Sequence, residues 1–297
     1  MTDSNQQSGL SKEQIDSVIA LYSAGQYQEA INQIKILNQS YPNIPFLFNL
    51  IGACYKSLGQ LEGSVKMFET AVNLKSDYAE AHKNLGITLK DLGQLDAAAE
   101  SLNKAIVIDP NYVDAHYNLA ITLKELNQLD ASVKSYHKVI KINPNFAQAY
   151  NNLGNLLKDL NQTDEALKNY QKALELNPNF AHAYNNLGNA YKDLGQLKEA
   201  VTNYLQAIEK NPNFSEAHNN LGNAYKDLAE LDSALKSYQK AVEIDDNLYE
   251  AYYNLGVVLI QLKRFNDAIH CFESAIEINP NFAQAFNNLG SALMSLG

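Results

Sequence analysis

AQAYNNLGNLLKDLNQTDEALKNYQKALELNPNF (residues 147–180) is followed at once by AHAYNNLGNAYKDLGQLKEAVTNYLQAIEKNPNF (residues 181–214), and the two segments align without a gap. Their period is 34 residues. The same register continues in both directions without an insertion, and such a period is typical of a helical repeat array. It predicts eight repeats, at 11–44, 45–78, 79–112, 113–146, 147–180, 181–214, 215–248 and 249–282. Residues 283–297 match only the first helix of a ninth repeat, and residues 1–10 are expected to form a disordered tail.

Each repeat carries the pattern of two amphipathic helices, which we call helix A and helix B. Counting places from the first residue of a repeat, apolar or small residues at places 3, 7, 10, 11 and 14 share one arc of helix A. Place 15 is Gly or Asn in six repeats, and these residues accept the left-handed geometry that ends a helix. Proline near place 32 ends helix B, because it cannot continue a helix; the six are Pro42, Pro110, Pro144, Pro178, Pro212 and Pro280.

The repeat resembles the tetratricopeptide repeat. The resemblance rests on an aromatic at place 4, Leu-Gly at 7 and 8, Ala at 20 and 27, an aromatic at 24 and Pro at 32. In the fifth repeat these are Tyr150, Leu153, Gly154, Ala166, Ala173, Tyr170 and Pro178. The resemblance covers residues 11–297 and implies an all-α, alpha-alpha superhelix, a tetratricopeptide solenoid whose A helices line a concave groove. It implies a scaffold that binds a partner protein.

Composition and charge restrict the partner. The formal net charge is −10, which disfavours binding to a phosphate backbone, so no nucleic acid is expected. Apolar runs are too short for a membrane span, and the first ten residues lack the features of a secretory signal. The two cysteines, Cys54 and Cys271, stand at non-equivalent places of their repeats, which favours reduced thiols and a cytoplasmic location.

Amide side chains repeat on the polar arc of helix A, at places 5, 6 and 9, and Lys recurs at place 12, commonly before an acid. A carboxamide both donates and accepts hydrogen bonds, so a row of them can pair with the backbone of an extended peptide. The row is similar to the asparagine ladder of the protein O-linked N-acetylglucosamine transferases. The predicted peptide-binding residues are Asn84, Asn118, Asn151, Asn152, Asn155, Asn185, Asn186, Asn189, Asn219, Asn220, Asn223, Asn254, Lys158, Lys192 and Lys226.

The same residues allow structural interpretations. Asn at place 6 lies at the edge of the polar arc and could bond to the neighbouring helix, whereas places 5 and 9 are expected to point further outward. The Lys and Asp residues could form an ordinary solvated face. The near-identity of the central repeats could also record duplication.

Chemistry of other kinds has little support in the sequence. His82, His116 and His218 occupy place 4, where other repeats carry aromatics, so we interpret them as packing residues rather than metal ligands. No nucleophile stands beside a base at a recognisable spacing, and no cofactor motif occurs. We therefore expect no catalysis, metal or cofactor. Two alternatives to a simple scaffold stay open: the non-catalytic, substrate-recruiting N-terminal arm of a larger enzyme such as a glycosyltransferase, and a self-assembling scaffold that associates through its convex face or its open end at Leu293.

Overall fold

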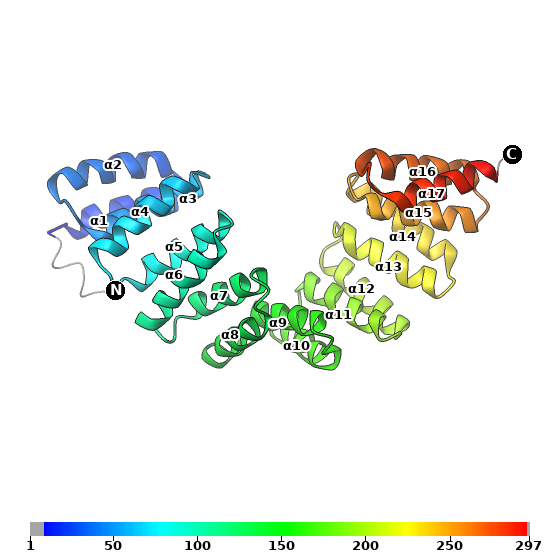
Figure 1. Cartoon of the computed structure of the whole chain (residues 1–297), viewed down its shortest axis with the longest axis horizontal. Helices are drawn as coiled ribbons and strands as arrows, with labels where there is room; N and C mark the ends of the chain where they lie inside the picture. Colours follow the sequence, from blue (N-terminus) through cyan, green and yellow to red (C-terminus); the bar gives the residue numbers. More distant parts are fainter. Residues whose placement is uncertain (1–8, 296–297) are drawn as a thin grey trace. The chain divides into compact units, whose positions relative to one another are not determined.

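The computed structural model describes residues 9–295, and within them the regular structure consists of seventeen α-helices (Figure 1). The described residues form two compact halves, with the boundary between residues 144 and 145, and each half is described separately. Residues 1–8 of the expected tail lie outside the described residues, whereas Leu10 is buried against the first helices. The N-terminal half contains α1 (Lys12–Ser23), α2 (Tyr27–Ser40), α3 (Pro45–Ser57), α4 (Leu61–Leu74), α5 (Ala79–Asp91), α6 (Leu95–Ile108), α7 (Val113–Glu125) and α8 (Leu129–Ile142). The C-terminal half contains α9 (Ala147–Asp159), α10 (Thr163–Leu176), α11 (Ala181–Asp193), α12 (Leu197–Lys210), α13 (Ser215–Asp227), α14 (Leu231–Ile244), α15 (Tyr249–Gln261), α16 (Phe265–Ile278) and α17 (Ala283–Met294).

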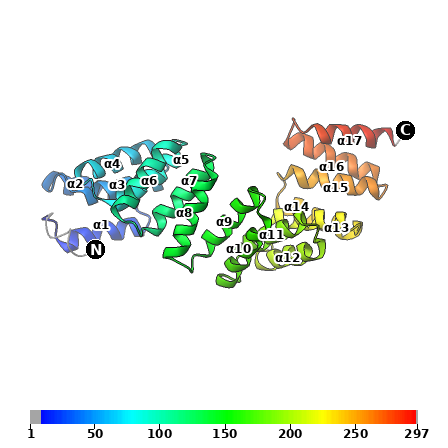
Figure 2. The same ribbon diagram turned by 60° about the horizontal axis from the view of Figure 1, so that its bottom comes forward.

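Odd-numbered helices are the A helices and even-numbered helices the B helices of the predicted repeats. The predicted solenoid is confirmed: in the views of Figures 1 and 2 each of the helices α1 to α15 with an odd number lies beside the B helix of its own repeat, and within a half each B helix also contacts the A helix of the next repeat. Consecutive A helices such as α3 and α5, or α11 and α13, touch directly. Each half therefore has a face made only of A helices, which we call the A face.

The turn between the two helices of a repeat depends on place 15. The backbone there is left-handed in all eight repeats, with φ between 58° and 75°. Gly or Asn supplies this conformation at six positions, as predicted. The other two are Ala229 and Lys263, which adopt φ 61° despite a steric cost for side chains with a Cβ. The left-handed turn therefore forms at place 15 of each repeat, even where the residue at that place disfavours this conformation.

Close contact between helix A and helix B depends on the glycine at place 8. A Cβ added at Gly188 would stand 2.6 Å from the ring of Tyr204, at place 24 of the same repeat. The same contact recurs at Gly154 with Tyr170 and at Gly222 with Tyr238. The small residues at places 20 and 27 that flank these rings, such as Ala200 and Ala207, are fully buried. The place-24 side chain therefore fills the middle of each helix pair and forms its core.

Candidate functional site

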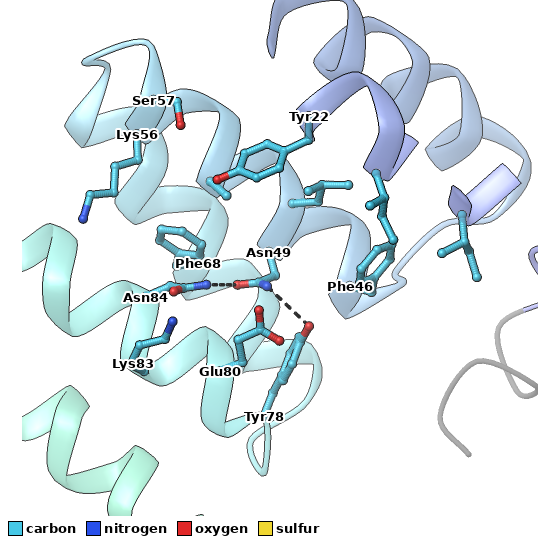
Figure 3. Close-up of a pocket in the computed structure, with 14 residues that line it drawn as sticks. Tyr22, Phe46, Asn49, Lys56, Ser57, Phe68, Tyr78, Glu80, Lys83 and Asn84 are labelled. Atoms are coloured by element: carbon cyan, nitrogen blue, oxygen red, sulfur yellow. Dashed lines mark hydrogen bonds between the residues drawn. The ribbon is translucent and has the colours of Figure 1, made fainter. Parts of the chain in front are cut away.

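Asparagines on the A face are bonded to one another across neighbouring repeats. In the N-terminal half the Nδ2 of Asn84, at place 6, donates to the Oδ1 of Asn49, at place 5 of the preceding repeat, over 3.0 Å (Figure 3). The C-terminal half repeats this bond three times at the same 3.0 Å. The three pairs are Asn186 with Asn151, Asn220 with Asn185, and Asn254 with Asn219. The predicted row of amides is therefore also a series of links between repeats.

The partner of each place-6 asparagine depends on place 5 of the repeat before it. Where that residue is Tyr253, the Nδ2 of Asn288 donates to its hydroxyl over 3.1 Å. Where it is Lys83, which has no acceptor, the Nδ2 of Asn118 instead donates to the carbonyl of Asp114 in its own helix. In these pairs the place-6 asparagine bonds to the neighbouring A helix wherever place 5 of the preceding repeat offers an acceptor. For these asparagines the structural interpretation of place 6 is confirmed.

The expectation that place 5 points further outward than place 6 is wrong. Asn151 is only 5% exposed and Asn185 is also buried, whereas Asn152 and Asn186 at place 6 are half-buried. The cause is the next repeat, since its A helix packs beside place 5 and its place-6 amide bonds to it. A buried amide needs such a partner. Asn152 also accepts a bond from the Nδ2 of Asn151, at 3.3 Å.

The asparagines at place 9 accept hydrogen bonds from the tyrosines of the core. The hydroxyls of Tyr170, Tyr204 and Tyr238 are buried, and each donates to the Oδ1 of the place-9 asparagine of its own repeat. The bonds are 2.7–2.8 Å long and join these tyrosines to Asn155, Asn189 and Asn223. Burial raises the pKa of all three tyrosines well above the ordinary value, so the hydroxyl stays a donor. Place 9 is therefore partly structural too.

These internal bonds use one end of each amide and leave the other end available. At place 9 the Oδ1 is occupied, and the Nδ2 of Asn189 or Asn223 has no acceptor within residues 9–295. At place 6 the Nδ2 is occupied, and the Oδ1 of Asn186 or Asn220 has no donor there. All four side chains are half-buried. The A face of the C-terminal half consequently presents one oriented donor and one oriented acceptor in each of its central repeats.

Three of the lysines at place 12 form ion pairs with the acid at place 13 of the following repeat. Lys56 lies 2.9 Å from Asp91, Lys158 lies 3.1 Å from Asp193, and Lys192 lies 3.8 Å from Asp227. These side chains are partly exposed, so each pair is worth at most about 1 kcal/mol. Lys226 has no ion pair among the described residues, because place 13 of the next repeat is Gln261. It is a free cation at the end of the row.

The A face of the N-terminal half is different, because it contains a pocket of about 570 Å³ between α1, α3 and α5 (Figure 3). Lys56, Glu80 and Lys83 supply its charged groups, and Lys83 has no ion pair in the described part of the chain. The Nδ2 of Asn49 also points to the Tyr78 hydroxyl, at 3.4 Å. Its remaining lining is largely apolar: Ile15, Ile19, Tyr22, Phe46, Leu50, Ala53 and Phe68. One weak signal for this pocket was present in the sequence, namely the small residue Ala53 at place 9.

Within the described residues, no cluster of His, Cys, Asp or Glu has the arrangement of a metal site. The histidines at place 4 contact backbone instead: a ring nitrogen of His82, His116 or His218 lies 3.0–3.1 Å from the carbonyl oxygen of the residue six positions earlier. Burial lowers the pKa of His218. None of the helices in residues 9–295 combines the length and the apolar character that a membrane span requires.

Comparison with protein families agrees with this architecture. The tetratricopeptide repeat model matches residues 52–93 and 88–126. The chain is therefore a tetratricopeptide-repeat protein, a helical scaffold built from stacked helix pairs. A second model, described as "Cilia and flagella-associated protein 70 C-terminal domain", matches residues 115–297, more than half of the chain. The chain belongs to that family.

Solved structures give the same fold. A crystal structure of MamA is 29% identical with a TM-score of 0.52, over 54% of this chain and 94% of MamA. YrrB, described as "a TPR protein with an unusual peptide-binding site", is 28% identical with a TM-score of 0.51, over 64% of this chain and 97% of YrrB. A chain of the Cut9-Hcn1 hetero-tetramer of the APC/C, at 17% identity and a TM-score of 0.66, covers 94% of this chain and 55% of its own length, and shows the fold alone. No curated protein sequence matches the chain.

Proposed function

We propose that the chain is a protein-interaction scaffold whose A face binds an extended peptide segment of a partner. The observation that carries the proposal is the pair of oriented, unoccupied amide groups in the central repeats: the Nδ2 at place 9 and the Oδ1 at place 6. A peptide backbone offers the complementary carbonyl and N–H groups in each residue. The peptide-binding site named for YrrB supports this assignment, since that protein is similar along most of its length.

The internal bonds make these amides effective ligands. A surface asparagine normally loses side-chain freedom when it binds, which costs about 0.5–1.5 kcal/mol. Asn189 has already lost that freedom, because Tyr204 holds its Oδ1 at 2.7 Å. Asn186 is held in the same way through Asn151. The A face therefore recognises the peptide backbone with groups that are already in place, and this kind of recognition depends little on the peptide's side chains.

The N-terminal half by itself offers a place for a peptide side chain. Its pocket of about 570 Å³ has apolar walls, and Lys83 at its edge lacks an ion pair in the described residues. A bulky apolar residue next to an acidic one fits both features. The free Lys226 of the C-terminal half favours acidic peptides in the same way.

The test uses substitutions that change the outward end of an amide and keep its inward end. In the triple variant Asn155→Asp, Asn189→Asp and Asn223→Asp, each carboxylate still accepts the tyrosine hydroxyl, but the outward N–H donor is lost. We expect a peptide selected from a displayed library of short linear peptides to bind this variant at least about tenfold more weakly. Thermal unfolding should change little. Unchanged peptide affinity would contradict the proposal.

The matched control adds the same charge elsewhere. Asn73, Asn103 and Asn266 are exposed on B helices. Replacing these three with Asp should leave peptide binding close to that of the unmodified chain, apart from a small effect of net charge. If the control weakens binding as strongly as the place-9 variant, long-range repulsion rather than lost hydrogen bonds is the cause.

A further inference from the structure

The A face of the N-terminal half carries an apolar row at place 9, where the central repeats of the C-terminal half carry asparagine. The row consists of one residue from each of four consecutive repeats: Ile19, Ala53, Ile87 and Ile121. Ile19 and Ala53 line the same pocket (Figure 3), and α3, α5 and α7 touch in succession, so equivalent residues of these helices follow one another along the face. The A faces of the two halves therefore differ in chemistry.

The residues of this apolar row are partly open to solvent. Ile87 is half-buried, whereas Leu85 and Leu89, two residues away on either side, are buried in the core. Ile121 is also half-buried, and Ile19 is 40% exposed. The helix α5 contacts both α3 and α7, so the exposure of Ile87 does not depend on either end of the chain. A contiguous apolar surface of this kind, with polar residues beside it, marks an interaction site.

The apolar row favours a helix over an extended strand as its ligand. An extended strand carries a carbonyl and an N–H in each residue, and these groups need partners. In the C-terminal half the Nδ2 of Asn189 or Asn223 offers a donor at place 9. An isoleucine offers none, so carbonyls placed on this row would lose water without gaining a hydrogen bond. A helix satisfies its own backbone and presents only side chains, and its apolar face therefore fits this row.

Charged residues border the apolar row and indicate the polarity of the ligand. Lysines follow the row on one side, at place 12 of three repeats: Lys56, Lys90 and Lys124. Two of them share one acid, since Lys56 lies 2.9 Å and Lys90 lies 3.3 Å from the carboxylate of Asp91. Lys83, at place 5, has no ion pair among the described residues. The acids at place 2 stand at the opposite edge, and they are Glu80 and Asp114. Acidic residues along one flank of the ligand are complementary to the lysine edge.

We infer that the A face of the N-terminal half binds an amphipathic helix of a partner protein, with the apolar face of that helix on the place-9 row and its acidic flank toward the place-12 lysines. Neighbouring helices pack about 8–10 Å apart, so the row spans about 25–30 Å. A helix of about 18 residues has this length. The pocket of about 570 Å³ between α1, α3 and α5 accommodates one large side chain of the helix. The inference does not rest on the binding of an extended peptide by the C-terminal half.

The experiment selects a ligand for the full chain from a displayed library of helical peptides, about 18 residues long. Each peptide consists of Ala, Glu and Lys, with the residues of one face varied among Leu, Ile, Met and Phe. The selected peptide is synthesised and its affinity is measured by fluorescence anisotropy. We expect Ile87→Asn to weaken binding about tenfold, because the introduced amide loses water in an apolar contact, and Ile121→Asn to do the same.

The matched control makes a similar change in the other half. Val257 is the apolar residue at place 9 of the repeat 249–282, and it is half-buried like Ile87. Val257→Asn should leave the affinity within about twofold of the unmodified chain, since this residue lies outside the proposed site. Thermal unfolding of all three variants shows that the fold is retained.

Changes in the peptide test its helical conformation and leave the chain unmodified. Proline at the centre of the peptide should weaken binding about a hundredfold, because it breaks the helix. A hydrocarbon staple between residues i and i+4 on the solvent side should tighten binding, because the helix is then formed in advance. Replacement of Glu by Gln along the flank should weaken binding and reduce its dependence on salt.

Two results would overturn the inference. The first is a selection that yields no peptide whose affinity depends on Ile87 or Ile121, and the second is a dependent peptide that tolerates the central proline. Neither result concerns the C-terminal half, because its peptide binding is measured with a different library and with the Asp variants at place 9 of that half.

Discussion

The bond between Tyr204 and Asn189 gives a quantitative test of why place 9 carries asparagine. The tyrosine is fully buried and its hydroxyl donates to the amide oxygen over 2.7 Å. In the variant Asn189→Ala the hydroxyl keeps its buried position and loses its acceptor. An unsatisfied buried donor costs about 1–3 kcal/mol, so we expect the free energy of unfolding to fall by about 2 kcal/mol.

Tyr204→Phe should cost less, because it removes the donor, and Asn189, which is half-buried, can turn its oxygen to water. We expect a loss of about 1 kcal/mol. The double variant removes both partners and should be more stable than Asn189→Ala alone. The chain already pairs phenylalanine with an apolar residue at the same two places: Phe68 with Ala53, and Phe272 with Val257. The double-mutant cycle should therefore give a coupling energy of about 1–2 kcal/mol.

The assay is urea unfolding followed by far-UV circular dichroism, with the midpoints compared at an unchanged slope. Repeat arrays can lose cooperativity, so hydrogen exchange at the amides of α11 and α12 should accompany it and show the loss within that repeat. Asn73→Ala, an exposed site on a B helix, is the control. Strictly additive losses, with the double variant the least stable of the three, would refute the structural role of place 9.

Three further predictions concern the turns, the tyrosines and the thiols. Ala229→Gly and Lys263→Gly should each raise the free energy of unfolding by about 1 kcal/mol in urea titrations. The reason is that a left-handed backbone costs a residue with a Cβ about 1–2 kcal/mol, and the added freedom of glycine in the unfolded chain offsets only part of this. Gly195→Ala should lower the free energy of unfolding, and a loss of stability in the two glycine variants would contradict this explanation. Burial raises the pKa of Tyr170, Tyr204 and Tyr238, so the native state holds protons that the unfolded chain releases. Stability should thus be insensitive to these groups below about pH 10 and fall above it, by at most about 1.4 kcal/mol per pH unit for each tyrosine, as unfolding measured from about pH 9 upward will show. Burial raises the pKa of Cys54 and of Cys271 to about 11, so both should react with an aromatic disulfide reagent at pH 8 far more slowly than in the denatured chain, and a rapid native reaction of either would disagree with the structure.

Much of the fold is predictable from the sequence because the determining signals are local and repeated. A glycine such as Gly195 at a fixed distance from a proline such as Pro212 marks where helices end, and the period carries that information to repeats that lack the signal. Ala229 and Lys263 occupy left-handed turns that no residue-by-residue rule predicts. They follow only from their place in the repeat.

The site was harder to predict, because a helical wheel describes one helix alone. The wheel places Asn151 on the polar arc of its own helix and takes no account of neighbouring helices. In the structure the A helix of the next repeat buries this residue. The role of place 9 had a partial signal in the sequence: Asn occurs there only in repeats with Tyr at place 24, although Tyr136 is accompanied by Ile121. The N-terminal pocket had almost none. Its volume depends on how side chains from α1, α3 and α5 pack together, which no single repeat encodes.

The amide links between repeats have a consequence for how such a chain can grow. Each link takes its acceptor from place 5 of one repeat and its donor from place 6 of the next, so a repeat such as 181–214 carries one half of each of its two links, in Asn185 and Asn186. A tandem copy of that segment supplies both missing halves at once. Duplication of a single 34-residue repeat therefore lengthens the array without any compensating substitution, whereas a copy of the repeat that contains Lys83 interrupts the row. The uniformity of the central repeats is what allows their number to change.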